Sequence, residues 1–310
     1  MPSSTVYVAT DVDRFAALVR PQTEHTITGR GVFAAAATRI DLHRLKMQRI
    51  RVSHSGHGHG HQMIDRAAIV FATGGMVWKG VELAASDIGL VHADRPFWYH
   101  HRAPVQFGSM SLSPEELAGM SVAMSGRDLT LPLNYLTMRA TPASHAKLLR
   151  LHAAASDLAQ RAPEMVTHSE AARGLEQALI EAMFACMDAQ AVETRRGWRH
   201  QTAIVKRFRA ALEENTEEPI YMPELCQRLG LSMRALRNYC HDHLGMGPKR
   251  YLLLRRMNLA YQALRAAQPS ETTVTQVATR FGFWELGRFA VEYRAWCGEL
   301  PSATLNRMPN

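Results

Sequence analysis

The strongest constraint on this chain is a pattern that occurs twice in its last third: a short amphipathic stretch, a glycine and a second amphipathic stretch. In the first copy, apolar residues at three- and four-residue spacing precede Gly230, and Ser232 is placed to cap the next helix. In the second copy, a similar short series precedes Gly282, and a helix is expected over about 284–296. This is the pattern of a helix-turn-helix, whose second helix enters the major groove of DNA.

The outer face of the second helix in the first copy carries residue types that read base edges. Arginine donates two parallel hydrogen bonds to guanine O6 and N7, and asparagine pairs with adenine N6 and N7. The predicted base contacts of this first unit are Met233, Arg234, Arg237 and Asn238. The alternative for the whole region is a helical bundle that uses the same turns for packing alone.

The second copy offers a different outer face, with Glu285, Gly287, Arg288 and Glu292. We therefore expect this second unit to act mainly as a clamp on the DNA backbone, helped by Arg288 and Arg294.

A long helix is predicted between the two copies, from Pro248 to about Ala266. Some 19 residues at ~1.5 Å each span about 28 Å, close to the ~34 Å between successive major grooves on one face of DNA. Such a helix would place both reading helices in adjacent grooves. The predicted phosphate contacts are Lys249, Arg250, Arg255 and Arg294.

Charge along the chain agrees with this interpretation. The chain holds 36 Lys and Arg against 28 Asp and Glu, a formal charge of +8, of which residues 200–310 carry +5. Between residues 233 and 265, seven basic side chains face the single acid Asp242. A basic excess alone is a weak indicator, but one concentrated on these helices favours a polyanionic partner.

Residues 200–310 resemble the DNA-binding domain of the AraC/XylS transcriptional regulators, two helix-turn-helix units joined by a long helix. The resemblance is carried by residues 224–232, 244–251, 274–283 and 298–302. It implies a sequence-specific, effector-responsive activator that binds promoter DNA and contacts RNA polymerase. Val291 with Glu292 departs from the family at a face that often carries a base, which implies stronger base reading by the first unit.

Residues 1–135 have a different sequence pattern, with short apolar runs separated by glycine and polar turns. Strands are predicted at residues 45–52, 67–73, 75–83, 88–92 and 105–112, and their spacing favours an antiparallel sheet or barrel. Residues 86–97 resemble the ligand-sensing domain common in this family, a small cupin-like barrel. The expected fold class is therefore α+β, with a β-rich sensor and an all-α DNA-binding domain.

A small-molecule effector of unknown identity is expected in the β-rich part. Aromatic side chains would line an apolar cavity and polar ones would orient the effector. The candidate pocket residues are Arg51, Trp78, His92, Arg95, Trp98 and His100, with Phe97 and Tyr99 as further aromatic candidates.

Alternating histidines lie between His54 and His61. On a strand they would share a face and suit Zn²⁺, Ni²⁺ or Fe²⁺, but no carboxylate lies among them. The glycines between them favour a solvated loop over a metal site. We predict no metal and no cofactor, with adventitious and functional metal binding as the alternatives.

Helical spacing returns from about 143 to 190. Residues 136–190 are expected to form a packing or dimerisation segment, with a capping box at residues 167–170 and a linker at 191–199 before a helix at 200–214. The family resemblance implies a homodimer whose seam holds Leu175, Leu179, Met183 and Cys186; the alternative is that these residues cover their own barrel.

Other classes find little support in the residues. The four cysteines are far apart, and no apolar run approaches the roughly 20 residues of a membrane span. The N-terminus lacks a basic segment followed by an apolar one, so a cytoplasmic protein without membrane partners is expected. Hydrolase, P-loop and dinucleotide motifs are missing, and we predict no catalytic residues. The alternative function is a cupin-like metalloenzyme with an accessory nucleic-acid-binding tail.

Overall fold

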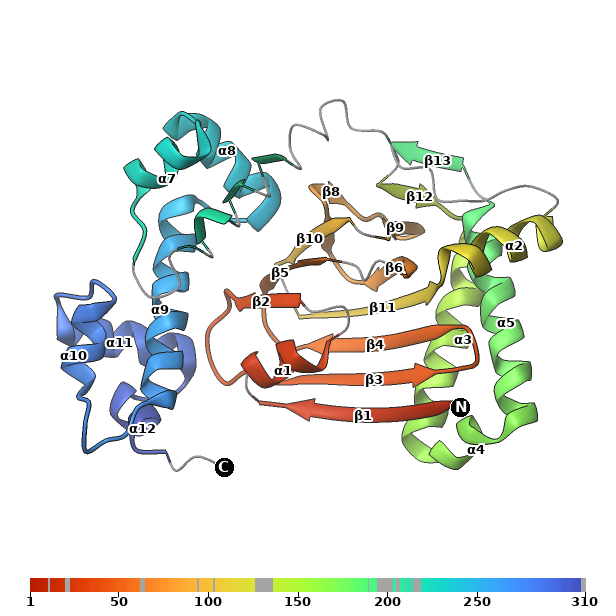
Figure 1. Ribbon diagram of the computed structural model, residues 1–310, viewed down its shortest axis with the longest axis horizontal. Coiled ribbons are helices and arrows are strands. Elements are labelled where there is room, and N and C mark those ends of the chain that lie inside the picture. The colour runs from red at the N-terminus through yellow and green to blue at the C-terminus, as the bar shows by residue number, and fades with distance from the viewer. Residues whose placement is uncertain are drawn as a thin grey trace. The chain divides into compact units, whose positions relative to one another are not determined.

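The computed structural model describes residues 1–10, 12–19, 23–61, 65–93, 95–102, 104–125, 136–188, 190–193, 203–204, 207–208, 210–212, 214 and 219–307. The chain divides into two compact units, one of residues 1–25 and 34–195 and one of residues 26–33 and 196–310. The first unit is rich in strands and the second is helical (Figure 1). The α+β fold class predicted from the sequence is confirmed.

The larger sheet of the first unit has the strand order β1-β3-β4-β11-β6-β9-β12-β13, and its determined pairings are antiparallel. Its strands are β1 (Ser3–Ala9), β3 (Ala35–Asp41), β4 (Lys46–Val52), β6 (Ala67–Thr73), β9 (Asp87–Val91), β11 (Val105–Leu112), β12 (Thr137–Arg139) and β13 (Gln190–Glu193). The strands predicted at 45–52, 67–73, 88–92 and 105–112 are therefore present, each to within a residue.

The smaller sheet has the order β2-β5-β10-β7-β8. Its strands are β2 (Thr23–Ile27), β5 (Gly56–His61), β7 (Met76–Trp78), β8 (Val81–Glu82) and β10 (Pro96–His101). The single strand predicted at 75–83 is two strands, because Lys79 and Gly80 adopt positive φ values of 49° and 81° and turn the chain between them.

The histidine-rich segment is a strand, so the prediction of a solvated loop is wrong. Strand β5 pairs with β10 and places His57 opposite His100 and Gly58 opposite Tyr99. A Cβ atom at Gly58 would lie 2.6 Å from the Tyr99 ring. The glycine at this position makes room for an aromatic ring on the neighbouring strand and is not a sign of flexibility.

Helices of the first unit are α1 (Val12–Leu18), α2 (Pro114–Ser125), α3 (Pro142–Arg161), α4 (Pro163–Thr167) and α5 (Ser169–Met187). Thr141 caps α3 by accepting a hydrogen bond from the Ser144 amide at 3.1 Å. The predicted capping box at 167–170 is wrong: α5 begins after His168 without a side-chain cap, and Thr167 Oγ1 donates to the Glu164 carbonyl at 2.8 Å.

Strand alternation gives the larger sheet two chemically different faces. Ile40, Met47 and Met110 lie on the face covered by α3 and α5, and together with apolar residues of those helices they form the main core (Figure 1). Arg39 and Gln48, which face each other across β3 and β4, lie on the opposite face. One face of this sheet therefore supplies the main core, and the other presents these polar side chains beside buried apolar ones such as Phe107.

The residues predicted as a dimer seam belong to this core. Leu179, Met183 and Cys186 are each 0% exposed, and the partly buried Leu175 packs against the same cluster. Their stripe on α5 covers the sheet of their own unit, because that face offers a continuous apolar surface. The burial of Leu179, Met183 and Cys186 contradicts the predicted seam, whereas for the partly buried Leu175 the seam stays a prediction.

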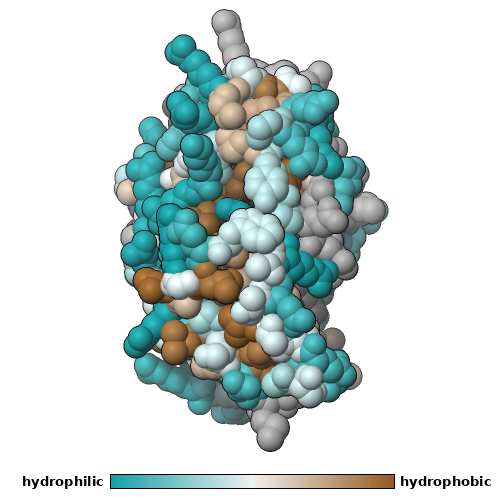
Figure 2. All heavy atoms as spheres, turned by 90° about the vertical axis from the view of Figure 1, so that its left-hand side faces the viewer, coloured by the Kyte–Doolittle hydropathy of each residue, from teal (hydrophilic) through white to brown (hydrophobic). Residues whose placement is uncertain are grey.

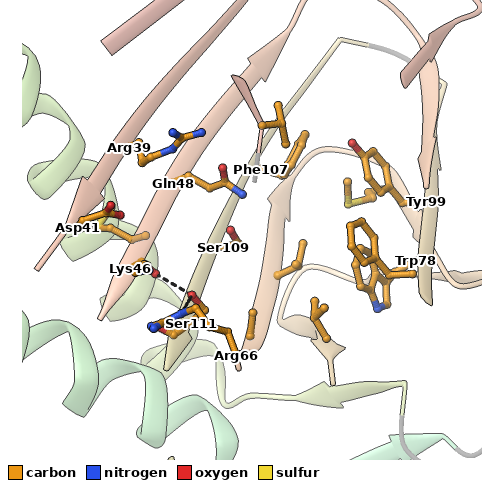
Figure 3. A pocket seen from close by; sticks show the side chains of 17 residues that line it. Arg39, Asp41, Lys46, Gln48, Arg66, Trp78, Tyr99, Phe107, Ser109 and Ser111 are labelled. Atoms are coloured by element: carbon orange, nitrogen blue, oxygen red, sulfur yellow. Dashed lines mark hydrogen bonds between the residues drawn. The ribbon is translucent and has the colours of Figure 1, made fainter. Parts of the chain in front are cut away.

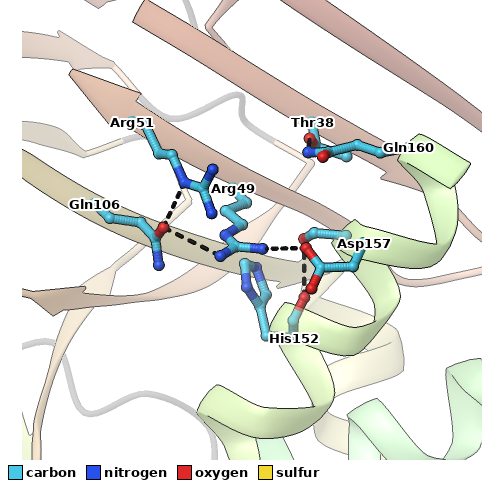
Figure 4. Close-up of polar contacts among 8 residues, drawn as sticks. Thr38, Arg49, Arg51, Gln106, His152, Asp157 and Gln160 are labelled. Atoms are coloured by element: carbon cyan, nitrogen blue, oxygen red, sulfur yellow. Dashed lines mark hydrogen bonds and ion pairs between the residues drawn. The ribbon is translucent and has the colours of Figure 1, made fainter. Parts of the chain in front are cut away.

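Polar contacts also hold α3 and α5 on the sheet, and Figure 4 shows those of α3. Arg49 donates to Asp157 of α3 at 2.8 Å and to the Gln106 side chain at 3.2 Å. Glu176 of α5 accepts from the backbone amides of Arg44 and Leu45, at 2.7 and 2.9 Å, between β3 and β4. These contacts join the middle of β4 to α3 and the turn between β3 and β4 to α5.

A close approach at Gly108 fixes how α3 lies on the sheet. His152 of α3 stacks edge-on against Phe71, with ring centroids 4.9 Å apart, and its Nε2 contacts the Gln48 carbonyl at 3.1 Å. A Cβ atom on Gly108 would lie 2.5 Å from Phe71 and 2.6 Å from His152. Only glycine leaves room for the imidazole at this point of β11.

The second unit contains α7 (Met222–Leu229), α8 (Met233–Leu244), α9 (Pro248–Ala266), α10 (Val274–Arg280), α11 (Leu286–Cys297) and α12 (Pro301–Leu305). Of the helix predicted at 200–214, the structure describes residues 203–204, 207–208 and 210–212 as helical. The predicted linker at 191–199 begins inside strand β13, and residues 194–199 lie outside the described residues.

Replacing Leu179 by alanine tests the assignment of α5 to the core. We expect Leu179→Ala to lower the free energy of unfolding by about 2–5 kcal/mol, since a fully buried leucine leaves a cavity. Urea denaturation measures the loss, and sedimentation velocity should give the same mass for variant and parent. A change of mass with unchanged stability would return Leu179 to an intermolecular seam.

Replacing Gly108 by alanine tests the close approach of α3. We expect Gly108→Ala to destabilise the protein by about 1–3 kcal/mol through overpacking against His152 and Phe71. Gly119→Ala in α2 is the matched control, because nothing lies within 4 Å of its added Cβ and alanine favours a helix by about 1 kcal/mol. Equal thermal stability of the two variants would contradict the close approach.

Candidate nucleic-acid interface and ligand cavity

The first helix-turn-helix forms where the sequence predicts it. Helix α7 ends at Gly230, whose φ of 64° is the left-handed conformation that glycine adopts at helix ends. Its amide and that of Leu231 contact the last carbonyls of α7, and α8 begins at once. The Ser232 side chain accepts from the Ala235 amide at 3.2 Å and so caps α8.

Helix α8 separates an inward from an outward face. Leu236, Tyr239 and Cys240 are buried, and the Phe208 and Tyr239 rings pack with centroids 5.3 Å apart. The four residues predicted to contact bases all lie on the exposed side: Met233, Arg234, Arg237 and Asn238. The helix thus exposes two guanidinium groups and an amide, the donors that base readout needs.

The second helix-turn-helix has the same construction. Thr273 and Gln276 form a capping box at the start of α10, and Gly282 makes the turn with a φ of 76°. Helix α11 begins two residues later than expected, at Leu286, and buries Phe289 and Tyr293.

The outer face of α11 differs from that of α8. Glu285, Gly287 and Arg288 are exposed as predicted, but the Arg288 guanidinium contacts Glu292 at 2.8 Å and Glu285 at 4.0 Å. These two carboxylates raise the pKa of Arg288 and oppose much of its charge.

Two large apolar residues close to this arginine in the sequence are exposed, and Trp284 is not among the contacts predicted from the sequence. Trp284 is 78% exposed and Val291 71%. Figure 2, which looks onto the side where α7, α10 and α11 lie, shows hydrophobic atoms among strongly hydrophilic ones.

Helix α9 joins the two helix-turn-helix motifs over the 19 residues that the sequence predicts. Lys249 and Arg250 are exposed at its start, and Arg250 also donates to the Thr28 carbonyl at 3.4 Å. Arg255 does not fit a phosphate contact, because its Nη2 donates to the Leu212 carbonyl at 2.6 Å inside the unit.

Arg256, which is not among the predicted contacts, links both helix-turn-helix motifs. Its guanidinium lies 5.9 Å from the Tyr221 ring at the start of α7 and 5.2 Å from the Phe283 ring after the second turn. Its Nη1 donates to the Gly282 carbonyl at 3.4 Å. One cation on α9 therefore contacts the start of the first helix-turn-helix motif and the turn of the second.

A cavity of about 90 Å³ lies between the two sheets of the N-terminal unit (Figure 3). Of the six predicted pocket residues, only Trp78 lines it. Trp98 and His100 alternate with Phe97 and Tyr99 on β10, so they project to the other side, and Arg51 projects toward α3 and contacts Gln106 at 2.6 Å. His92 and Arg95 follow β9 and do not line the cavity.

The polar wall of the cavity was missed in the sequence. It contains Arg39, Asp41, Lys46, Gln48, Ser109 and Ser111, from β3, β4 and β11, and Arg66 from just before β6. The signal is a polar residue at every second position in three segments. Only the strand register turns that signal into one surface, since Gln48 lies between Arg39 and Ser109, and Lys46 between Asp41 and Ser111.

Buried histidines of this unit are held neutral. Burial lowers the pKa of His25 to about 3, and its Nε2 hydrogen bonds to the Tyr99 hydroxyl at 2.8 Å. Burial lowers the pKa of His152 to about 4, and that of His57 falls well below its usual value. Within the described ranges, no three or more His, Cys, Asp or Glu side chains gather as a set that suits a metal ion.

A double helix-turn-helix DNA-binding protein is the class that these elements define. A model of the helix-turn-helix domain family matches residues 225–307. A probable thc operon regulatory protein of Rhodococcus erythropolis is 36% identical over 98 residues, 32% of this chain and 30% of that protein. The XylDLEGF operon transcriptional activator 2 of Pseudomonas putida is 32% identical over 113 residues, 36% of this chain and 72% of that protein.

The chain belongs to the AraC/XylS family of transcriptional regulators. It spans about 30% of the length of the first curated relatives that it matches. The solved structure of the AraC-like transcriptional activator CuxR is 14% identical and covers 84% of this chain and 96% of its own, with a TM-score of 0.44. Among the described residues, no helix has the length and apolar character to cross a membrane.

Acid should destabilise the protein through its buried histidines. An unfolded histidine binds a proton below about pH 6.5, whereas His25 and His152 stay neutral in the fold until about pH 3 and 4. The unfolded state therefore gains protons first, and stability present near pH 7 is lost as the pH falls through this window, by at most about 1.4 kcal/mol per pH unit for each histidine.

Urea denaturation at several pH values between about 7 and 4 measures this loss. His152→Gln, which cannot titrate, should show a shallower dependence of stability on pH than the parent. Parallel curves for the two proteins would contradict the neutral state of His152.

Proposed function

We propose that this chain is a sequence-specific transcriptional activator that binds promoter DNA through α8 and α11 and responds to a small molecule in its N-terminal unit. The observation that carries the proposal is the outer face of α8. It exposes Arg234, Arg237 and Asn238 while its other face is closed by the core. Each exposed group is a donor or acceptor suited to the edge of a base pair.

The two helix-turn-helix motifs take different parts in this proposal. The first reads bases through Met233, Arg234, Arg237 and Asn238, as its exposed arginines favour. The second contacts DNA through Glu285, Gly287 and Arg288 with less charge, because Glu285 and Glu292 oppose Arg288. Phosphates are held by the exposed side chains of Lys249, Arg250 and Arg294, and Arg255 is not included.

Regulation is the second part of the proposal. The names of the relatives, an operon regulatory protein and an operon transcriptional activator, favour activation of an operon. Contact with RNA polymerase belongs to the proposal as an implication of the family resemblance. The cavity between the sheets is the candidate effector site. An effector acts only through different affinities for two arrangements of the protein, since equal affinity shifts no equilibrium. The proposal includes no catalysis and places the protein in the cytoplasm.

A homodimer is part of the sequence-based expectation, but Leu179, Met183 and Cys186 cannot form its seam while they are buried in the core. The alternative function, a metalloenzyme with a nucleic-acid-binding tail, has no cluster of ligating side chains among the described residues from which to be argued.

Paired substitutions test base reading. Selection of bound genomic fragments by the full chain first yields its target sequence. Arg237→Ala should then lose discrimination at one base pair, worth about 1–3 kcal/mol, because a bidentate contact to guanine is removed. Lys249→Ala is the control and should weaken target and scrambled duplexes alike, with a shallower dependence on salt.

Fluorescence anisotropy with single-base variants of the target measures both effects. An equal loss on target and scrambled duplexes for Arg237→Ala would remove its role in base reading. Recovery of no enriched sequence by the parent protein would overturn the proposed function as a whole.

A further inference from the structure

A tryptophan lies exposed at the N-terminal end of helix α11. Trp284 is 78% exposed, although tryptophan is on average a well-buried residue type. It lies two residues before Leu286, the first residue of α11. The N-terminal residues of a recognition helix are those that contact base edges in the major groove. The indole is therefore placed where the second helix-turn-helix would read bases.

The segment that carries Trp284 is anchored by its neighbour Phe283. Phe283 is buried, and its ring packs on that of Phe289 with centroids 4.7 Å apart. Its amide donates to the Ala278 carbonyl at 2.9 Å, and the Arg256 guanidinium lies 5.2 Å from its ring. Because Phe283 is fixed in the core, the backbone of Trp284 is fixed at the surface, and little backbone entropy is lost on binding.

The charged groups at this end of α11 largely oppose one another. Arg288 contacts Glu292 at 2.8 Å and Glu285 at 4.0 Å, so these three side chains, one cation and two anions, have a formal charge of −1. A guanidinium held by two carboxylates must leave them before it can bond a phosphate or a guanine. Charge-assisted contacts therefore contribute less to this motif than the exposed arginines of α8 contribute to the first.

The major groove offers one apolar group to a side chain such as an indole. That group is the C5-methyl of thymine, which apolar side chains contact, whereas the other groups on the base edges donate or accept hydrogen bonds. A large aromatic ring at the end of a recognition helix therefore matches thymine better than any other standard base.

Gly287 lies three residues after Trp284, on the exposed side of α11. A Cβ atom added there would have nothing within 4 Å, so the packing of the unit does not require glycine at this position. Glycine inside a helix is less stable than alanine. A close approach of the helix backbone to the floor of a groove gives the glycine a purpose, because a side chain would hold the two apart.

We propose that the second helix-turn-helix selects thymine and that Trp284 is the residue that makes this selection. The indole packs on the C5-methyl of a thymine in the half-site that α11 contacts, and Gly287 allows the helix to come close. This inference rests on the proposed function, in which α11 enters the major groove, and it names the base that this motif selects.

Replacing thymine by uracil in the target duplex tests the contact, because uracil keeps the O4 acceptor and lacks the C5-methyl. The target is the sequence selected by the full chain, and Arg237→Ala identifies the half that α8 contacts. The thymines of the other half, one helical turn away, are replaced one at a time. Fluorescence anisotropy should show about fourfold weaker binding at one of them, as expected for one apolar carbon. Uracil in the flanking sequence should leave the affinity unchanged.

Three variants assign this preference to the indole. Trp284→Ala should bind the thymine and uracil duplexes equally, and Trp284→Phe, which keeps an aromatic ring, should still prefer thymine. Val291→Ala is the control of similar chemistry. Val291 is 71% exposed on the same helix, but seven residues at ~1.5 Å each place it about 10 Å further from the groove-entering end. Val291→Ala should keep the preference of the parent.

Two glycine variants test the close approach. Gly287→Ala should weaken binding to the target without lowering the thermal stability of the protein. Gly174→Ala in α5 is an equivalent change, since Gly174 is also an exposed helical glycine with nothing within 4 Å of an added Cβ. It should leave DNA binding unchanged.

Equal affinity of the parent for thymine and uracil at every position of that half would overturn the inference. An unchanged preference for thymine in Trp284→Ala would also overturn it and leave the indole to a protein partner. A selected sequence confined to the half that Arg237 reads would overturn it while keeping base reading by α8. Recovery of no enriched sequence would overturn the proposed function itself, and this inference with it.

Discussion

The N-terminal unit depends on the strand alternation of its larger sheet, which sends Ile40, Met47 and Met110 to one face and Arg39, Gln48 and Ser109 to the other. The apolar face, with Ile40, Met47 and Met110, is buried beneath α3 and α5. Because those helices bury one face, the opposite face lines the cavity between this sheet and the smaller one. The core and the candidate ligand site are thus two sides of the same strands, and a slip of one residue in register would exchange them.

The C-terminal unit depends on two left-handed glycines and on one cation. Gly230 and Gly282 turn the chain between the two helices of each helix-turn-helix motif, with φ values of 64° and 76°. Arg256 on the connecting helix contacts Tyr221, just before the first helix-turn-helix motif, and Phe283, just after the turn at Gly282 in the second. These contacts couple the orientation of α9 to both helix pairs, which is what simultaneous engagement of two grooves requires.

The candidate DNA-contacting residues could be found from the sequence because they depend on local order. Helical spacing, Ser232 and Gly230 together determine which side of α8 faces outward, and Arg234 and Arg237 lie there. Arg255 shows the limit of this reasoning, since its distance from the Leu212 carbonyl depends on how two helices pack. Helical periodicity predicts the direction in which a side chain projects, but not the residue that it contacts.

The sequence by itself determined the double helix-turn-helix, the connecting helix and the strand positions of the larger sheet within 45–112, because these follow from spacing along the chain. Tertiary structure decided which strands are neighbours, and therefore that Arg39, Gln48 and Ser109 share one wall while Trp98 and His100 face away from it. It also decided that the stripe of Leu179 and Met183 covers its own sheet. Side-chain periodicity is a property of a single segment, whereas a cavity or a buried face requires the register and packing of segments far apart in the sequence.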